Sequence, residues 1–279
     1  MQVARTVTEY RALRALQPSP LGLVPTMGYL HEGHCSLMRR ARAECATVAV
    51  TIFVNPTQFG PNEDFTRYPR DEARDLAICE AQGVDLVFAP SIEEMYPEGA
   101  TTTVSVGLLS TVLEGATRPG HFDGVTTVVT KLFAIAQADR AYFGQKDAQQ
   151  LIVIRRMTQD LRLSVEIVGC PIVREADGLA LSSRNVYLSP EEREQALSLS
   201  RGLRAAEAAW HADVRDAGSL RERVRREIGV QPLADIDCVS LADASTLQEL
   251  EGRVERPALL SLAVRFGATR LIDNVVLEP

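Results

Sequence analysis

The sequence lacks a long hydrophobic run, and none of its apolar stretches approaches the roughly 18 to 20 residues that span a bilayer. Its opening residues, MQVARTVTEYRALRAL, predict a polar strand and a helix, without the charged head and apolar core of a signal peptide. Paired cysteines are also missing, because the five cysteines are widely scattered and never form a CxxC pair. We therefore expect reduced, mostly buried thiols in a cytoplasmic protein that has no membrane partner.

Runs of Lys or Arg are absent too, and the 279-residue chain has a net charge of −7. This acidic balance argues against nucleic acid or an anionic membrane as the main partner, but it is compatible with a local basic pocket for phosphates. Aromatic residues make up only 5% of the chain, whereas Leu, Val, Ile and Ala dominate, which favours buried parallel strands and helices. The length suits two modest domains or one large domain.

Strands and helices alternate up to about residue 170. Apolar runs predict strands at 21–24, 48–54, 84–89, 141–143 and 165–168, with helices near 34–45, 71–82, 124–137 and 147–160. Such alternation, with strands rich in Val and Ile, predicts an α/β fold built on a doubly wound parallel sheet. Ligands of these sheets bind at the carboxyl ends of the strands, so motifs that directly follow a strand are the candidates for a site.

The pattern changes beyond Pro171. The segment Ser189–Glu192 has a Ser cap, Pro in the first turn and Glu three residues on, which predicts the start of a helix. Helices are expected near 190–210 and 217–228, and strands at 236–241, 259–265 and 270–277, around a short helix near 244–250. We expect a first domain over residues 1–172 and a smaller α+β domain over residues 173–279.

The motif PTMGYLHEGH (residues 25–34) directly follows the first long strand. Gly28 lets backbone approach a ligand, and Gly33 lets a helix begin tightly against a phosphate that faces its N–H groups. His31 and His34 can both point at phosphate oxygens and stabilise the charge that builds on a leaving pyrophosphate. The alternatives are a turn with two surface histidines, or a metal site completed by Cys35.

The motif IFVNPTQFG (residues 52–60) also lies at a strand end. The amides of Asn55 and Gln58 both donate and accept hydrogen bonds. They would orient a carboxylate nucleophile without holding it as tightly in its ground state as an Arg clamp would. The alternative is an Asn-Pro turn with a solvent-facing Gln.

The motif RPGHF (residues 118–122) is a glycine-bounded loop that opens a helix. Either His121 or Arg118 could reach a substrate from this loop. The alternative is a loop that needs its glycine and serves to pack Phe122.

The motif FGQKDAQQ (residues 143–150) runs from a strand into Gly, Lys and Asp. Gly144 permits close approach, Lys146 offers a point charge for phosphate, and Asp147 could hold Mg²⁺ directly or through water. The alternative is a strand-end turn with an exposed Lys. If the chain becomes helical at once after Gly144, Lys146 and Gln150 share one helix face, whereas Gln149 is turned about 100° away.

The motif DGLALSSRN (residues 177–185) lies at the expected domain joint. Its Asp-Gly pair marks a turn, and Ser-Ser-Arg would place two hydroxyls and a guanidinium over phosphates. The segment would act as a lid, and the alternative is a hinge rich in turn residues.

Together these five motifs resemble those of the pantoate–β-alanine ligase family, and the ending TRLIDNVVLE resembles that family's last strand. Their order and spacing hold through residues 21–190. The resemblance implies a Rossmann-like N-terminal domain of the HxGH nucleotidyltransferase superfamily, a small C-terminal lid domain and a homodimer. It also implies two steps, in which pantoate and MgATP give pantoyl-adenylate and pyrophosphate, and β-alanine then displaces AMP.

The resemblance further implies roles for individual residues. His34 would be the proton donor, and the motifs themselves add His31 and Lys146 as catalytic candidates and Asp147 as the candidate metal ligand. Gln58 and Gln150 would hold pantoate, and Gln58 would also serve the β-alanine site, while the motifs themselves add Asn55 and His121 as substrate-binding candidates. ATP would contact Met27, Gly28, Tyr29, Leu30, His31, Glu32, Gly33, His34, Gly144, Gln145, Lys146, Asp147, Val173, Leu181, Ser182, Ser183 and Arg184. Gln145 departs from the family, which usually has Glu there.

Two other functions are compatible with parts of the sequence. Another nucleotidyltransferase of the superfamily, acting on a small phosphorylated substrate, should carry basic residues at positions 58 and 150, where this chain has Gln. A catalytically silent nucleotide-binding protein should lack His34 or Lys146, and both are present.

Overall fold

The computed structural model describes residues 1–61 and 65–279. The chain forms two compact units, one of residues 1–145 with 150–171 and the other of residues 146–149 with 172–279. In the described ranges, no helix is both long and apolar enough to cross a membrane. The cysteines carry free thiols, and four of the five are buried.

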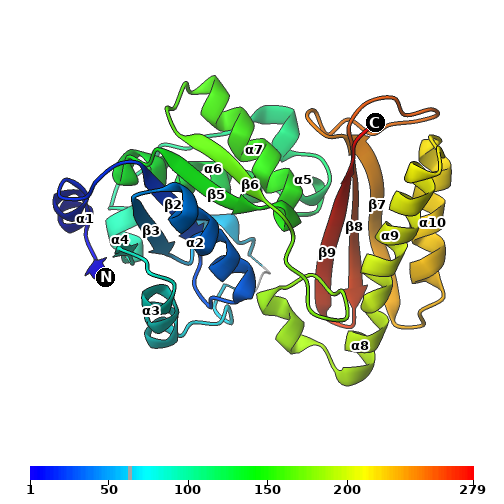
Figure 1. Cartoon of the computed structure of the whole chain (residues 1–279), viewed down its shortest axis with the longest axis horizontal. Helices are drawn as coiled ribbons and strands as arrows, with labels where there is room; N and C mark the ends of the chain where they lie inside the picture. Colours follow the sequence, from blue (N-terminus) through cyan, green and yellow to red (C-terminus); the bar gives the residue numbers. More distant parts are fainter. Residues whose placement is uncertain (62–64) are drawn as a thin grey trace. The chain divides into compact units, whose positions relative to one another are not determined.

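A six-stranded parallel sheet forms the centre of the N-terminal unit (Figure 1). Its strand order is β1-β4-β3-β2-β5-β6. The strands are β1 (Gln2–Ala4), β2 (Leu21–Thr26), β3 (Thr47–Ile52), β4 (Leu86–Phe88), β5 (Arg140–Gly144) and β6 (Glu166–Cys170). Because β2 pairs with β3 on one side and with β5 on the other, the motifs that follow these three strands emerge side by side.

Helices cover both faces of this sheet, which confirms the doubly wound α/β prediction. One apolar core joins the strands to α1 (Val7–Arg14), α6 (His121–Ala136) and α7 (Ala148–Asp160). The core on the other face joins them to α2 (Glu32–Glu44) and α3 (Glu72–Ala81). Short elements complete the unit: α4 (Ile92–Met95), α5 (Glu114–Thr117), and the 3₁₀ turns η1 (Pro56–Gln58) and η2 (Gly107–Ser110). A further 3₁₀ turn, η3 (Gln145–Asp147), begins in this unit at Gln145, and its last two residues belong to the other unit.

The C-terminal unit is a smaller α+β structure, as predicted. Its antiparallel sheet has the order β7 (Ala234–Asp243), β8 (Ala258–Phe266) and β9 (Thr269–Leu277), and α9 (Leu197–His211) and α10 (Ala217–Gly229) pack on it (Figure 1). The 3₁₀ turn η4 (Ser183–Tyr187) and α8 (Pro190–Gln195) precede them. The predicted cap is confirmed, because Ser189 and Glu192 form a reciprocal capping box.

The prediction of a short helix near 244–250 is wrong. The Asp243 carboxylate accepts the backbone N–H groups of Ser245 and Thr246, each at 2.9 Å, and Leu247 has φ of 57°. These backbone N–H groups bond to the Asp243 side chain and not to helical carbonyls, so the segment forms a turn and reverses direction. Burial alone would raise the pKa of Asp243, but these hydrogen bonds outweigh it and lower that pKa to about 2.

Close packing around β2 gives a test of the fold. A Cβ at Gly22 would lie 2.9 Å from Cys45 Sγ and 3.0 Å from Tyr142 Cε2. We expect Gly22→Ala to lower the free energy of unfolding by about 1–3 kcal/mol through overpacking, measured by denaturant titration. Gly229→Ala is the control, because a Cβ there meets nothing within 4 Å. Equal stability of Gly22→Ala and the parent protein would contradict this account of the sheet.

Candidate functional site

The turn between β2 and α2 is held by a buried carboxylate on α3. Asp75 is 1% exposed and accepts the backbone N–H groups of Tyr29 and Leu30, each at 2.7 Å. Gly28 has φ of 80°, and a Cβ there would lie 2.9 Å from Asp75 Oδ2. The turn therefore needs glycine at this position and an acceptor across from it. Asp75 was not among the predicted site residues, because it lies outside the five motifs and 46 residues from Tyr29.

His31 and His34 form the cap of α2. His31 Nδ1 accepts the N–H of Gly33 at 3.1 Å, and His34 Nδ1 accepts the N–H of His31 at 3.2 Å. A ring nitrogen that accepts a hydrogen bond carries no hydrogen, so both rings hold their hydrogen on Nε2. A Cβ at Gly33 would lie 2.8 Å from the His31 ring, which explains the glycine between them.

The start of α2 thereby collects hydrogen-bond donors. The two imidazole rings lie 4.1 Å apart between centroids, and each presents an Nε2–H group. The positive end of the helix dipole lies at the same place, so the arrangement suits an anion. The metal alternative gains no support, because burial raises the pKa of the Cys35 thiol and disfavours the thiolate that binds metals. No cluster of three or more metal-binding side chains is found in residues 1–61 and 65–279.

The loop after β3 carries two amides that are nearly inaccessible to solvent. Asn55 is 1% exposed and Gln58 is 9% exposed, so the alternative of a solvent-facing Gln is wrong. Gln58 Nε2 donates to Met27 Sδ at 3.0 Å, which brings this loop against the motif that follows β2. Asn55 Nδ2 donates both to Gln58 Oε1 at 3.2 Å and to the Gly124 carbonyl at 3.1 Å.

His121 and Arg118 hold the backbone of Gln58. The Gln58 carbonyl, which can only accept, lies 2.8 Å from His121 Nδ1 and 3.3 Å from Arg118 Nη2. His121 therefore carries its hydrogen on Nδ1, and Nε2 accepts from Arg118 Nη1 at 3.1 Å. Phe122 is 2% exposed, so the motif also packs the core, as its structural alternative predicted.

The chain after β5 becomes helical at once, but through a 3₁₀ turn. The segment η3 precedes α7, and a 3₁₀ turn rotates about 120° per residue, so Lys146 and Gln150 are less well aligned than in a continuous α-helix. Gln149 is 5% exposed, whereas Gln150 and Lys146 are half-buried. Lys146 Nζ lies 4.0 Å from Asp147 Oδ1, and Asn274 Nδ2 donates to the Lys146 carbonyl at 2.9 Å.

The segment DGLALSSRN belongs to the C-terminal unit, and hydrogen bonds within that unit hold it in place. Leu181 N–H donates to the Val173 carbonyl at 3.0 Å, and Ser182 Oγ accepts the N–H of Arg184 at 3.2 Å. Arg193 of α8 bridges the carboxylates of Glu175 and Asp177 at 2.7 and 2.6 Å. Sequence reasoning did not single out Arg193, which lies in a helix whose charged residues look like a solvated face.

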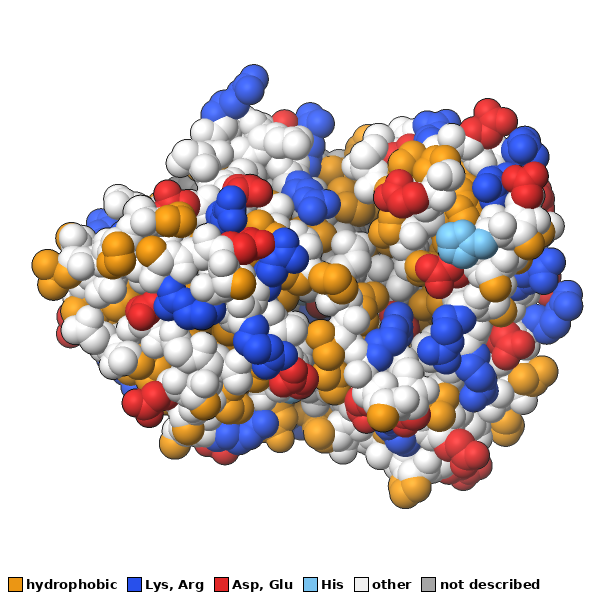
Figure 2. All heavy atoms as spheres, viewed as in Figure 1, with side chains coloured by type: hydrophobic (Ala, Val, Ile, Leu, Met, Phe, Trp, Pro, Cys, Tyr) orange, Lys and Arg blue, Asp and Glu red, His pale blue; other side chains and the backbone are white. Residues whose placement is uncertain are grey.

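The predicted residues thus divide between the two units. The N-terminal unit holds Met27–His34, Asn55, Gln58, His121, Gly144, Gln145 and Gln150. The C-terminal unit holds Lys146, Asp147, Val173 and Leu181–Arg184. On the face drawn in Figure 2, basic and acidic side chains are interspersed.

Comparisons with known proteins agree over the whole chain. A family model described as pantoate-beta-alanine ligase matches residues 2–276. A protein of Roseiflexus sp. (strain RS-1) named pantothenate synthetase is 63% identical over all of both chains. The crystal structure of pantothenate synthetase from Thermus thermophilus covers all of both chains at 49% identity, with a TM-score of 0.94. A pantoate-beta-alanine ligase from Francisella tularensis, solved with beta-gamma ATP and beta-alanine, matches with a TM-score of 0.80 at 33% identity, covering 99% of this chain and 97% of that one.

The ring orientations predict opposite tautomers within one protein. We expect long-range ¹H–¹⁵N correlation spectra at neutral pH to show His31 and His34 protonated on Nε2, and His121 protonated on Nδ1. His121 serves as the internal control, because its Nδ1 faces a carbonyl instead of an N–H group. A hydrogen on Nδ1 of His31 or His34 would overturn the capping geometry on which the donor assignment depends.

Proposed function

Because the chain belongs to the pantoate–β-alanine ligase family, we propose that it makes pantothenate through a pantoyl-adenylate. The pantoate carboxylate attacks the α-phosphorus of ATP, the bond to the leaving pyrophosphate breaks, and the amine of β-alanine then displaces AMP. The observation that carries this proposal is the pair of rings at the start of α2, whose Nδ1 atoms both accept backbone N–H groups. Donors held in advance stabilise the charge that develops as pyrophosphate leaves.

The nucleotide site in this proposal begins with the segment Met27–His34. His34 donates from Nε2 to a phosphate oxygen, and His31 supports it from one turn of chain away. Lys146 adds a positive charge for the phosphates. The remaining contacts to ATP come from Gly144, Gln145, Asp147, Val173 and Leu181–Arg184. The segment Leu181–Arg184 is part of a lid and contributes two Ser hydroxyls and the Arg184 guanidinium.

Mg²⁺ fits this arrangement through a single carboxylate. The Asp147 side chain is 51% exposed, and Mg²⁺ commonly keeps several waters and takes one or two carboxylates together with substrate phosphates. A dedicated cluster of protein ligands is therefore not needed. When bound, the ion would neutralise charge on the phosphates, and we assign Asp147 as its contact, directly or through water.

Pantoate is assigned to the neutral amides of Gln58 and Gln150. Gln58 contacts Met27 and so lies against the motif that follows β2. A neutral donor can orient a carboxylate without greatly lowering its reactivity as a nucleophile. Gln58 also serves β-alanine. His121 and Asn55 act on the same substrates by fixing Gln58, since His121 faces the Gln58 carbonyl and Asn55 donates to Gln58 Oε1. We place the protein in the cytoplasm, where its free thiols stay reduced.

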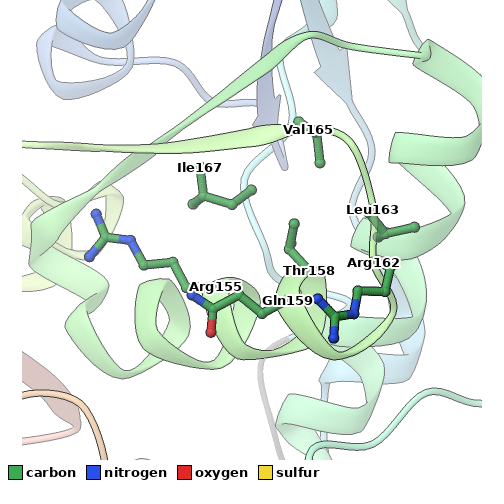
Figure 3. Close-up of a pocket in the computed structure, with 7 residues that line it drawn as sticks. All are labelled: Arg155, Thr158, Gln159, Arg162, Leu163, Val165 and Ile167. Carbon is green, nitrogen blue, oxygen red and sulfur yellow. The ribbon is translucent and has the colours of Figure 1, made fainter.

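We assign a homodimer to the free edge of β6. Among the described strands β6 pairs only with β5, and its sequence EIVGC contains neither Lys nor Pro to protect an edge. Glu166 N–H donates inward to the Asp139 carbonyl, so the N–H groups of Ile167 and Gly169 point outward. A groove of about 490 Å³ runs beside this edge between Ile167 and α7 (Figure 3). A second copy can pair there across a two-fold axis, which uses the same surface twice.

The two-step route predicts exchange of labelled pyrophosphate into ATP with pantoate alone. We expect His34→Ala to slow this exchange by about 100-fold or more, the scale of one positioned donor, with a much smaller change in ATP affinity measured by calorimetry. His211→Ala, at the exposed end of α9, is the control. Exchange that required β-alanine would exclude a free-standing adenylate, and weak ATP binding with normal turnover at saturation would make His34 a binding contact only.

The edge-strand dimer predicts a change of mass. Ile167→Pro removes an outward N–H without breaking the ladder to β5, so we expect sedimentation equilibrium to show a monomer in place of a dimer. Ile167→Ala removes a similar apolar contact but keeps the N–H, and it should remain dimeric. A monomeric parent protein would refute the dimer assignment. A dimeric Ile167→Pro variant would show that the interface does not lie at the edge of β6.

A further inference from the structure

A chain of hydrogen bonds leads from Tyr96 to Gln58, and no role has so far been given to its first member. We propose that Tyr96 is a positioning residue that, through Asn55, orients the carboxamide of Gln58 so that its N–H groups face the carboxylate-bearing substrate. This inference rests on the substrate role proposed above for Gln58. It adds a residue that lies 41 positions away from Asn55 in the sequence and outside all five motifs.

The orientation of the Asn55 amide is unambiguous. One end lies 3.4 Å from the backbone N–H of Thr57, which can only donate, and the other end lies 3.1 Å from the Gly124 carbonyl, which can only accept. The oxygen must therefore face Thr57 and the nitrogen must face Gly124. Gly124 makes this possible, because a Cβ there would lie 2.4 Å from the Thr57 carbonyl and would push α6 away from the loop.

The orientation of the Asn55 amide also determines the orientation of the Gln58 amide. The second hydrogen of Asn55 Nδ2 points at Gln58 from 3.2 Å, so the atom that receives it must be Oε1. Nε2 then lies on the opposite side, where it donates to Met27 Sδ at 3.0 Å. A thioether is a weak acceptor, so an oxygen of a substrate can replace it at little cost. The loop thus presents donors to its ligand and keeps its acceptors turned away.

Tyr96 anchors this arrangement from outside the loop. Its hydroxyl lies 2.8 Å from Asn55 Oδ1 and must be the donor, since that oxygen can only accept. The other donors to Oδ1 are the hydroxyl and N–H of Thr57, which belong to the same turn as Asn55. Of the hydrogen bonds to this oxygen within the described ranges, the one from Tyr96 alone ties it to a different part of the fold.

The Tyr96 ring is itself held in place. Lys131 Nζ lies 4.5 Å from the ring centroid and donates to the Met95 carbonyl at 2.6 Å. Burial raises the pKa of Tyr96, so its hydroxyl keeps the proton that it donates throughout the neutral range. The residue can therefore act as a fixed donor at neutral pH.

The test compares two phenol-to-phenyl changes by steady-state kinetics of the full-length protein. We expect Tyr96→Phe to raise KM for pantoate about 5- to 10-fold, the scale of one net hydrogen bond, with KM for ATP unchanged within about twofold. Tyr10→Phe is the matched control, because the Tyr10 hydroxyl is buried and has no hydrogen-bond partner within the described ranges. Tyr10→Phe should leave KM for all three substrates unchanged. Both variants should have melting temperatures close to that of the parent protein.

Three further variants separate the possible outcomes. Gln58→Ala should raise KM for pantoate at least as much, and adding Tyr96→Phe to it should have no further effect, because the positioned amide is gone. An unchanged KM in Gln58→Ala would refute the proposed role of Gln58 itself. A raised KM in Gln58→Ala with a normal value in Tyr96→Phe would refute only the role of Tyr96. Equal rises for pantoate and ATP, or an undiminished effect of Tyr96→Phe in the double variant, would show a general structural defect and overturn the inference. Asn55→Asp, which keeps the acceptor for Tyr96 but reverses the polarity toward Gln58, should raise KM for pantoate more than Tyr96→Phe does.

Discussion

The buried carboxylate of Asp75 is the contact on which the N-terminal site depends. Between β2 and α2 the chain passes through positive φ at Gly28 and Tyr29, a conformation that costs free energy for a residue with a Cβ. Two charge-assisted hydrogen bonds of 2.7 Å from Asp75 offset that cost, and they also offset the desolvation of the carboxylate. With the turn fixed, His31 falls at the cap of α2, and the remainder of the donor arrangement follows from helix geometry.

Backbone groups orient four polar side chains of the candidate site. The rings of His31 and His34 are oriented by backbone N–H groups, that of His121 by a carbonyl, and the amide of Asn55 by one of each. Backbone groups cannot exchange their roles as donor and acceptor, so they fix tautomers and amide orientations that side chains alone would leave open. These backbone contacts therefore give the candidate site a defined pattern of donors that does not depend on a ligand.

Much of the fold was predictable because it follows from periodicity and from end signals. The alternating strands and the Ser189 cap needed only local sequence, and the motifs after β2 and β3 lay together because parallel strands end at one edge. The predictions failed where a side chain competed with the helix, as Asp243 does in the turn that follows it. Asp75 and Tyr96 were not found for another reason. Each acts across a large sequence separation, 46 residues from Asp75 to Tyr29, and a single sequence carries no signal of such a contact.

The contrast between Gln58 and Asp75 shows how charge is distributed in this unit. Asp75, the charged acceptor, is 1% exposed and holds the backbone N–H groups of Tyr29 and Leu30, with Arg74 Nη1 at 4.0 Å from its Oδ1. The group of the β3 loop to which we assign the carboxylate substrate is neutral: it is the amide of Gln58, which donates to the thioether of Met27 after β2. A charge in that place would bind an anionic substrate strongly before reaction and would gain little more in the transition state. In the proposed reaction, strong interactions hold the backbone in place, and weak neutral ones meet the reacting carboxylate, as a nucleophilic substrate requires.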